Sequence, residues 1–336
     1  MTGRWQQGRQ RAYSVGGIHD SRTHPINFRA QSAPEVRWSV AVWCAPVNPE
    51  ALDLVSSLGP ELSPVMIQGT QQFFAARFTG LDRATAITRD QSYGPHERHR
   101  LDVFSTAGRR DASVLVFVHG GGFVMGDKRA PGLPFYDNIG DFAARAGFVG
   151  VTMTYRLAPA HPWPAGAEDV AAAVNWLRAN ISAHGGDPQR IFLIGQSAGA
   201  VHVAGYVASP SLHEGGDTGV AGAMLISGSY DVVAADANQF HRAYYGSQPE
   251  KWAAASTLEG LVATDLPLLF SVSEFDAADF QKQAALLTAA FTDARKRFPR
   301  MHWLAGHNHL SPVLAVGSPL DTLGPLIREF VERFEK

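Results

Sequence analysis

The segment Gly195-Gln196-Ser197-Ala198-Gly199 places a serine between two glycines, after the apolar run Ile191–Ile194 and before a second, mostly apolar run. A buried strand that turns at once into a helix strains the residue at the turn and lifts its side chain clear of the sheet. The two glycines leave room for the strand and the helix to approach each other. A serine held in this way is typical of nucleophilic catalysis, although the short pattern also occurs in ordinary turns.

Three further segments carry the groups that such a serine needs. The run His119-Gly120-Gly121-Gly122-Phe123 offers backbone N–H donors for an oxyanion, and the loss of one such donor costs about 3–4 kcal/mol of barrier. Glu274-Phe275-Asp276 offers a carboxylate, and Gly306-His307-Asn308-His309 offers a general base. The order of glycine loop, serine, acid and histidine along the chain is that of a hydrolase with a nucleophile elbow.

The glycine run also admits the interpretations of a plain turn or a phosphate loop. No Lys-Ser or Lys-Thr pair follows it, and the sequence has no G-x-G-x-x-G fingerprint, so nucleotide binding is not expected. The single cysteine, Cys44, excludes an internal disulfide framework and a cysteine-based zinc site. It fits a reducing compartment, so we expect a cytoplasmic protein. Catalysis by a serine, a histidine and an acid needs no metal and no cofactor, so we expect neither.

The elements that must position these groups alternate between strand and helix. Continuous apolar runs at 113–119 and 148–155 predict strands that are buried on both faces. Other strands are expected at 84–92, 99–104, 190–194, 222–227, 266–273 and 300–304, and helices at 167–184, 198–208, 279–298 and 321–334. This alternation predicts a mostly parallel sheet with helices on both faces. Because ligands bind beyond the carboxyl ends of such strands, the four segments should meet there.

Two parts of the chain are expected to form a small helical cap. Asn48-Pro49-Glu50 predicts a helix start, with Asn48 as the cap, and a second helix is expected at 64–78. The segment 230–265 is longer than an ordinary crossover and is rich in aromatic residues. We therefore expect residues 48–336 to form a single domain with cap elements at about 48–80 and 230–265.

Residues 1–47 show no clear periodicity, and we expect a disordered or irregular leader. The run Arg37–Ala45 faintly resembles the core of a signal peptide, which is the alternative interpretation, but it is short and lies far from residue 1.

The composition of the 336 residues excludes several other classes of function. Hydrophobic residues make up 45% of the chain, which is enough for a sizeable core, whereas charged residues make up 18% and the formal net charge is −2. Nothing in this balance attracts nucleic acid or an anionic membrane surface. No stretch of about 18 apolar residues predicts a membrane span. The expected partner is a small molecule, and the apolar strands permit a homodimer without requiring one.

The motifs resemble the α/β-hydrolase superfamily, in its branch of hormone-sensitive-lipase-like and small bacterial carboxylesterases, over roughly residue 48 to the C-terminus. Tyr155–Ala165 resembles that branch's YRLAPEHPFPA segment. Ser92–Pro95 and Leu101–Phe104 resemble the entry strands of small bacterial esterases and of kynurenine-formamidase-like proteins. The branch usually has GDSAGG at the elbow, whereas this chain has GQSAGA, which favours the neighbouring esterase and formamidase groups.

By position, the resemblance makes Ser197 the nucleophile and assigns the oxyanion donors to Gly121, Gly122 and Ala198. It also implies that Asp276 is the acid. Glu274 lies closer to the strand, and Asp279 belongs at the start of the next helix, where an acidic residue interacts favourably with the helix dipole.

The histidine is a choice between two residues in one loop. His309 is followed by the bulky Leu310, as the family's catalytic histidine commonly is, so His309 is preferred to His307. His119 is expected to hold the glycine loop by hydrogen bonds. The substrate pocket is expected to include the side chains of Phe123, Gln196, Trp163 and Tyr244.

The function that follows is a serine carboxylesterase that hydrolyses short-chain acyl or aryl esters through an acyl-enzyme intermediate. An arylformamidase-type amide hydrolase would use the same triad and is the alternative. A hydrolase fold that only binds a ligand is a third possibility, but such proteins typically lack the serine or the histidine.

Overall fold

The computed structural model describes residues 48–334, and the predicted leader at 1–47 lies outside them. Within the described range the strands form one eight-stranded sheet in the order β1-β2-β4-β3-β5-β6-β7-β8. The strands are β1 (Thr85–Ser92), β2 (Arg100–Thr106), β3 (Ala112–Val118), β4 (Val149–Met153), β5 (Gly186–Gln196), β6 (Gly222–Ile226), β7 (Leu268–Phe275) and β8 (Met301–Asn308). β2 pairs antiparallel with β1 and β4, and the other pairs are parallel, so the prediction of a mostly parallel sheet is confirmed.

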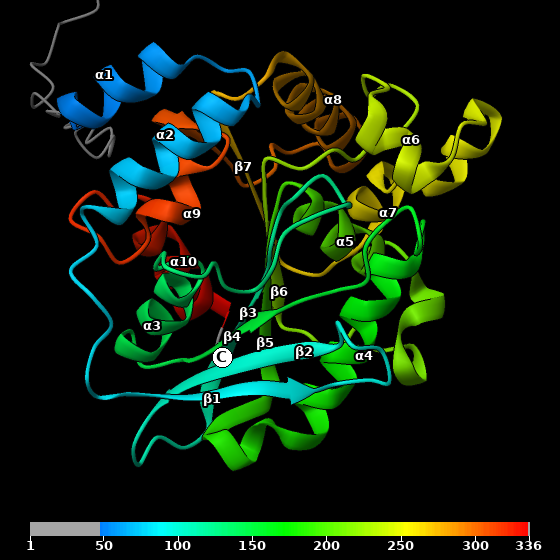
Figure 1. Ribbon diagram of the computed structural model, residues 1–336. Helices are drawn as coiled ribbons and strands as arrows, with labels where there is room; N and C mark the ends of the chain where they lie inside the picture. The colour runs from blue at the N-terminus through cyan, green and yellow to red at the C-terminus, as the bar shows by residue number, and fades with distance from the viewer. Residues whose placement is uncertain (1–47, 335–336) are drawn as a thin grey trace, which may run out of the picture. The chain divides into compact units, whose positions relative to one another are not determined.

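Helices cover both faces of this sheet, as predicted (Figure 1). Between sheet and helices lie two separate apolar cores. Strand β3 is buried throughout and supplies both: Val114 and Val116 face one core, and Leu115 and Phe117 face the other. The first core packs against α4 (Ala165–Asn180), α5 (Ala198–Val207), α7 (Leu258–Ala263) and α8 (Ala278–Arg295). The second packs against α3 (Asp137–Arg145), α9 (Ser311–Ala315) and α10 (Leu323–Phe334).

The helices before the sheet begin where their capping residues predict. In α1 (Pro49–Leu58) the Asn48 side chain accepts a hydrogen bond from the N–H of Ala51 at 3.0 Å. In α2 (Pro64–Ala75) the Ser63 hydroxyl accepts from the N–H of Met66 at 3.1 Å. α1 packs against β8 and α2 against α9, so both helices border the segment that carries the histidines.

The long segment after β6 folds into short helical pieces. It contains α6 (Gln239–Tyr245), a 3-10 helix at Pro249–Ala255 and α7. Other 3-10 turns lie at Ile181–His184, Pro210–Leu212 and Glu214–Gly216.

The structure corrects several details of the predicted elements. Helices α3 and α9 were not predicted, α2 ends at Ala75 instead of 78, α8 ends at Arg295 instead of 298, and β5 begins at Gly186 instead of 190. Strand β8 continues to Asn308, so His307 lies in the strand and not in a loop. The extension exists because β7 and β8 resume their pairing at Phe275 and Asn308 after an irregularity.

Candidate active site

Ser197 stands at the turn between β5 and α5 in a strained backbone conformation, with φ 56° and ψ −122°. Its own N–H donates to the carbonyl of Ile226 at 2.9 Å, which ties the turn to β6. The glycines around it are required by space. A Cβ on Gly199 would lie 2.0 Å from the carbonyl oxygen of Val118, and one on Gly195 would lie 2.5 Å from that of Gly199. The turn thus has the tight strand-to-helix geometry of the elbow that the sequence predicts.

Asp276 and His309 are brought together although they are 33 residues apart. The His309 ring donates through Nδ1 to Oδ1 of Asp276 at 2.6 Å, and both side chains are buried. The Nδ1–H bond leaves Nε2 as the basic nitrogen of the neutral ring. Among the described residues, this buried Nε2 has no hydrogen-bond partner, which is the condition of a nitrogen that can take a proton from a nucleophile.

The carboxylate of Asp276 is also held from its other side. Its Oδ2 accepts from the Ser227 hydroxyl at 2.7 Å and from the N–H of Ser273 at 2.6 Å. A buried carboxylate needs such donors, since it has lost its water. Sequence reasoning missed Ser227, and its position directly after β6 is the one signal that would have suggested it.

Gln196 and Asn308 attach the histidine segment to its surroundings. The Gln196 side chain donates to the backbone carbonyl of His309 at 2.9 Å, so the residue before Ser197 holds the segment that carries His309. The Asn308 side chain accepts from the N–H groups of Leu310 and Ser311, and it donates to Thr70 of α2 at 2.8 Å. Gln196 is thus buried beneath the elbow, and its assignment to the substrate pocket stays a prediction.

His307, the alternative base, is engaged elsewhere. Its Nδ1 lies 2.8 Å from the hydroxyl of Ser311 and its Nε2 lies 2.7 Å from that of Thr322. Burial lowers the pKa of His307 to about 4, so the ring stays neutral. With both nitrogens occupied, it has no free position for a serine proton.

The other acidic candidates also have structural partners. Glu274 accepts from the N–H of Gly306 at 2.7 Å, and Asp279 accepts from that of Asp236 at 3.2 Å. Neither contacts a histidine among the described residues.

The glycine loop after β3 has the conformation that only glycines adopt easily, with φ 130° at Gly121 and φ 57° at Gly122. Within residues 48–334, no hydrogen bond engages the backbone N–H of either glycine or of Ala198, so all three remain available as donors. As expected, His119 holds this loop: its Nδ1 donates to the carbonyl of Gly120 at 2.6 Å. Burial lowers the pKa of His119 to about 4.

Aromatic side chains lie next to these groups. Phe123 stacks on Tyr244 of α6, with ring centroids 4.3 Å apart. Phe240, also of α6, lies against the glycine loop, since a Cβ on Gly122 would be 3.1 Å from its ring. The Phe280 ring lies 4.2 Å from that of His309, a contact that sequence reasoning did not identify.

Trp163 and Tyr244, the remaining predicted pocket residues, differ in exposure. The Trp163 residue is 38% exposed, and its backbone N–H donates to the backbone carbonyl of Tyr244 at 2.9 Å. The Tyr244 ring is buried, and its hydroxyl lies 3.2 Å from Nδ1 of His202.

Comparison with known proteins decides the family. The sequence profile of the alpha/beta hydrolase fold matches residues 115–302, which is more than half of the chain. The chain belongs to the alpha/beta hydrolase fold family. The match includes the glycine loop, the elbow and Asp276, and the fold described above agrees with it.

Curated relatives of this α/β hydrolase include esterases. Esterase LipQ of Mycobacterium tuberculosis is 31% identical over 275 residues, which are 72% of this chain and 64% of that protein. Carboxylesterase NlhH of the same species is 44% identical over 96 residues, 27% of each chain. The chain therefore spans less than two thirds of the length of these relatives.

Solved structures show the same fold for this α/β hydrolase. An esterase from the bacterial hormone-sensitive lipase family superposes with a TM-score of 0.61 at 24% identity, covering 86% of this chain and 98% of the other. Esterase B from Lactobacillus rhamnosis gives a TM-score of 0.65 at 18% identity, covering 86% and 97%.

Residues 48–334 lack two features that other classes of protein have. No helix there has the length and apolar character that crossing a membrane requires. The same part of the chain contains no group of three or more His, Cys, Asp or Glu side chains placed to hold a metal ion.

Proposed function

We propose that the protein is a serine carboxylesterase of the hormone-sensitive-lipase-like branch, with Ser197, Asp276 and His309 as its triad. The observation that carries this proposal is the 2.6 Å bond between His309 and Asp276, which leaves Nε2 free in a segment bonded to the elbow through Gln196. The names of the relatives LipQ and NlhH, an esterase and a carboxylesterase, support it.

The proposed reaction has two stages. The Ser197 hydroxyl attacks the ester carbonyl carbon while Nε2 of His309 takes its proton, and the N–H groups of Gly121, Gly122 and Ala198 stabilise the oxyanion. His309 then gives the proton to the departing alcohol. Water attacks the acyl-enzyme in the second stage, with His309 again as the base, and releases the acid and free Ser197.

The proposed substrates are esters with a short acyl chain or an aryl group. Half-buried aromatic rings border the site on two sides, Phe240 at the glycine loop and Phe280 at the histidine. The segments 48–80 and 230–265, proposed as the cap, form short helices only. Such a site suits a small, flat ester better than a long triglyceride.

The first test is Ser197→Ala assayed with p-nitrophenyl acetate and butyrate. We expect turnover to vanish while the circular dichroism spectrum stays that of the wild type. A variant that retains most of its activity would refute the assignment of the nucleophile.

A second assay separates ester from amide hydrolysis. The elbow sequence GQSAGA resembles that of the neighbouring esterase and formamidase groups, so an arylformamidase is the alternative that this assay tests. We expect kcat/KM for p-nitrophenyl butyrate to exceed that for N-formylkynurenine. The reverse order would replace the carboxylesterase assignment by an arylformamidase with the same triad.

The proposal extends to the cellular location and the oligomeric state of the enzyme. With one cysteine in 336 residues, the chain needs no oxidising compartment, and we propose that it acts in the cytoplasm on a small-molecule ester. A homodimer remains a prediction, which the molar mass from light scattering tests.

A further inference from the structure

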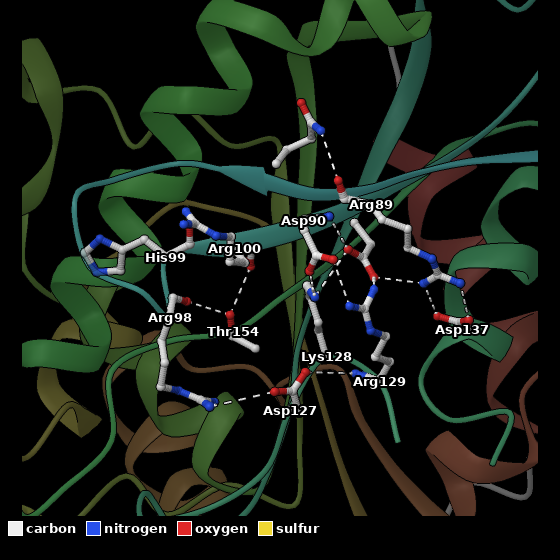
Figure 2. Close-up of polar contacts among 12 residues, drawn as sticks. Arg89, Asp90, Arg98, His99, Arg100, Asp127, Lys128, Arg129, Asp137 and Thr154 are labelled. Atoms are coloured by element: carbon white, nitrogen blue, oxygen red, sulfur yellow. Dashed lines mark hydrogen bonds and ion pairs between the residues drawn. The ribbon is translucent and has the colours of Figure 1, made fainter. Parts of the chain in front are cut away.

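A network of charged side chains joins the β1–β2 hairpin to the segment that follows the glycine loop (Figure 2). At its centre the fully buried Asp102 of β2 pairs with Arg89 at 2.8 Å, Arg129 at 3.1 Å and Lys128 at 3.3 Å. Lys128, itself only 3% exposed, also pairs with Asp90 at 2.6 Å. If one member of such a buried cluster moves away, another charge is left buried without a partner, which is costly. The geometry of this cluster is therefore more firmly fixed than that of a surface ion pair.

Arg98 reaches the same segment from the turn between β1 and β2, but it binds backbone and not only carboxylate. Its Nε donates to the carbonyl of Tyr155 at 2.7 Å and its Nη2 to that of Gly126 at 2.8 Å, while Asp127 lies 3.7 Å away. One planar guanidinium thus joins two chain segments, a geometry that the single ammonium of lysine does not reproduce. The carbonyl of Arg98 in turn accepts from the Thr154 hydroxyl at 2.5 Å.

Gly126 is packed directly onto the glycine loop. A Cβ on Gly126 would lie 2.5 Å from the carbonyl oxygen of Gly120 and 2.6 Å from Nδ1 of His119. The preceding residue, Met125, donates its N–H to the carbonyl of Gly121 at 3.1 Å. A Cβ on Gly121 would lie 2.1 Å from the carbonyl oxygen of Met125. Because these backbones are in contact, a displacement of Gly126 moves the peptide groups that present the oxyanion donors.

The other carbonyl bound by Arg98, that of Tyr155, belongs to a residue that also contacts the glycine loop. The Tyr155 hydroxyl donates to the carbonyl of His119 at 2.9 Å, and its ring stacks on that of His119 with centroids 4.3 Å apart. Arg98 therefore holds the glycine loop from both ends, through Gly126 on one side and through Tyr155 on the other.

We propose that Arg98 is a positioning residue that sets the direction of the Gly121 and Gly122 N–H groups toward the oxyanion. The proposal rests on the carboxylesterase function proposed above. Oxyanion donors act mainly in the transition state, so their misplacement lowers kcat and leaves substrate binding nearly unchanged.

The experiment compares Arg98→Ala and Arg98→Lys with a matched control, Arg295→Lys. Arg295 is similarly exposed, 28% against 22% for the side chain of Arg98. It also donates to backbone carbonyls, those of Val262, Ala263 and Thr264 at 2.6–2.7 Å, but at the C-terminal end of α7. Arg295 thus bonds to backbone carbonyls as Arg98 does, but away from the glycine loop, and its variant measures the effect of a purely structural arginine.

With p-nitrophenyl butyrate we expect kcat of Arg98→Ala to fall about 10- to 100-fold with KM within twofold, since the loss of a whole oxyanion donor costs about 10²–10³-fold. Arg98→Lys, which can satisfy one carbonyl, should lie between it and the wild type. The inhibition constant of a trifluoromethyl ketone, which forms an oxyanion on Ser197, should rise by the same factor as kcat/KM falls. The pH dependence of kcat/KM should not move, because Arg98 contacts neither Asp276 nor His309.

The inference is overturned if folded Arg98→Ala keeps kcat within twofold of the wild type, or if Arg295→Lys loses as much kcat. Should Arg98→Ala fail to fold, Arg98→Lys decides by the same criteria. Absence of ester turnover and of ketone inhibition in the wild-type enzyme would instead refute the proposed function.

Discussion

Three donors converge on Asp276, and this arrangement defines the site at the scale of single residues. The N–H of Ser273, the hydroxyl of Ser227 and the His309 ring all bind its carboxylate at 2.6–2.7 Å. The aspartate therefore has one position in which all its bonds are made, and it fixes the orientation and tautomer of the imidazole.

Replacing Ser227 by alanine should weaken this support. The buried Oδ2 would keep only the N–H of Ser273, so we expect the free energy of unfolding to fall by about 1.5–3 kcal/mol and kcat to fall by up to about tenfold. Urea unfolding and ester turnover measure the two effects. Ser271→Ala is the matched control, since the Ser271 hydroxyl is equally buried in β7 but has no hydrogen-bond partner within residues 48–334. Equal losses in both variants would contradict this role of Ser227.

The triad candidates could be read from the sequence because each stands in a short local pattern. The partners could not, since Ser227 and Phe280 belong to other elements and reach the site only through tertiary packing. The choice between His307 and His309 also depends on tertiary contacts. The hydroxyls of Ser311 and Thr322 bind the two ring nitrogens of His307, and no local sequence pattern predicts these bonds.

At the scale of the elements, the predictions are best where periodicity is plain and worst where polar residues are buried. Helix α3 was missed because its first residue follows Tyr136, which makes no side-chain cap, and because its buried face includes Asn138 and Asp141. The structure pairs both: Asn138 donates to the carbonyls of Val313 and Val316, and Asp141 accepts from Thr85. The first pair of bonds fixes α9, which follows His309.

The contact between the elbow and β3 should tolerate no side chain at Gly199. In Gly199→Ala the new methyl group would collide with the carbonyl of Val118, a backbone atom that cannot turn away. We expect a loss of at least about 2 kcal/mol of stability and of most ester turnover. Gly205→Ala in the same helix is the control, because its Cβ would meet only the methyl group of Ala167 at 3.0 Å. An active, stable Gly199→Ala enzyme would show that the elbow is looser than described.

At the scale of the whole molecule, three histidines of the described residues are buried and stay neutral at ordinary pH. Burial lowers the pKa of His119 and of His307 to about 4 and that of His202 to about 3, from an ordinary value of 6.5. The unfolded chain takes up these protons near pH 6.5, whereas the folded chain does so only near pH 3–4. The unfolded state binds more protons in between, so stability falls as the pH drops through this window.

A variant at His307 tests this pH dependence. At about 1.4 kcal/mol per pKa unit, His307 makes the folded state about 3 kcal/mol less stable at pH 4 than at pH 7. His307→Gln cannot titrate, so its stability deficit relative to the wild type should shrink by about that amount between pH 7 and pH 4. Chemical unfolding at several pH values measures this stability difference. A difference that stays constant between pH 7 and pH 4 would contradict the lowered pKa of His307.

The central claim is that Ser197 is reactive because His309 can take its proton. The most direct measurement is the rate at which a fluorophosphonate forms an adduct, located by peptide mass spectrometry, in the wild type and in folded His309→Ala. We expect an adduct on Ser197 in the wild type and a rate at least about 10³-fold lower in the variant. An unmodified Ser197 in the wild type, or labelling of the variant at the wild-type rate, would contradict the account.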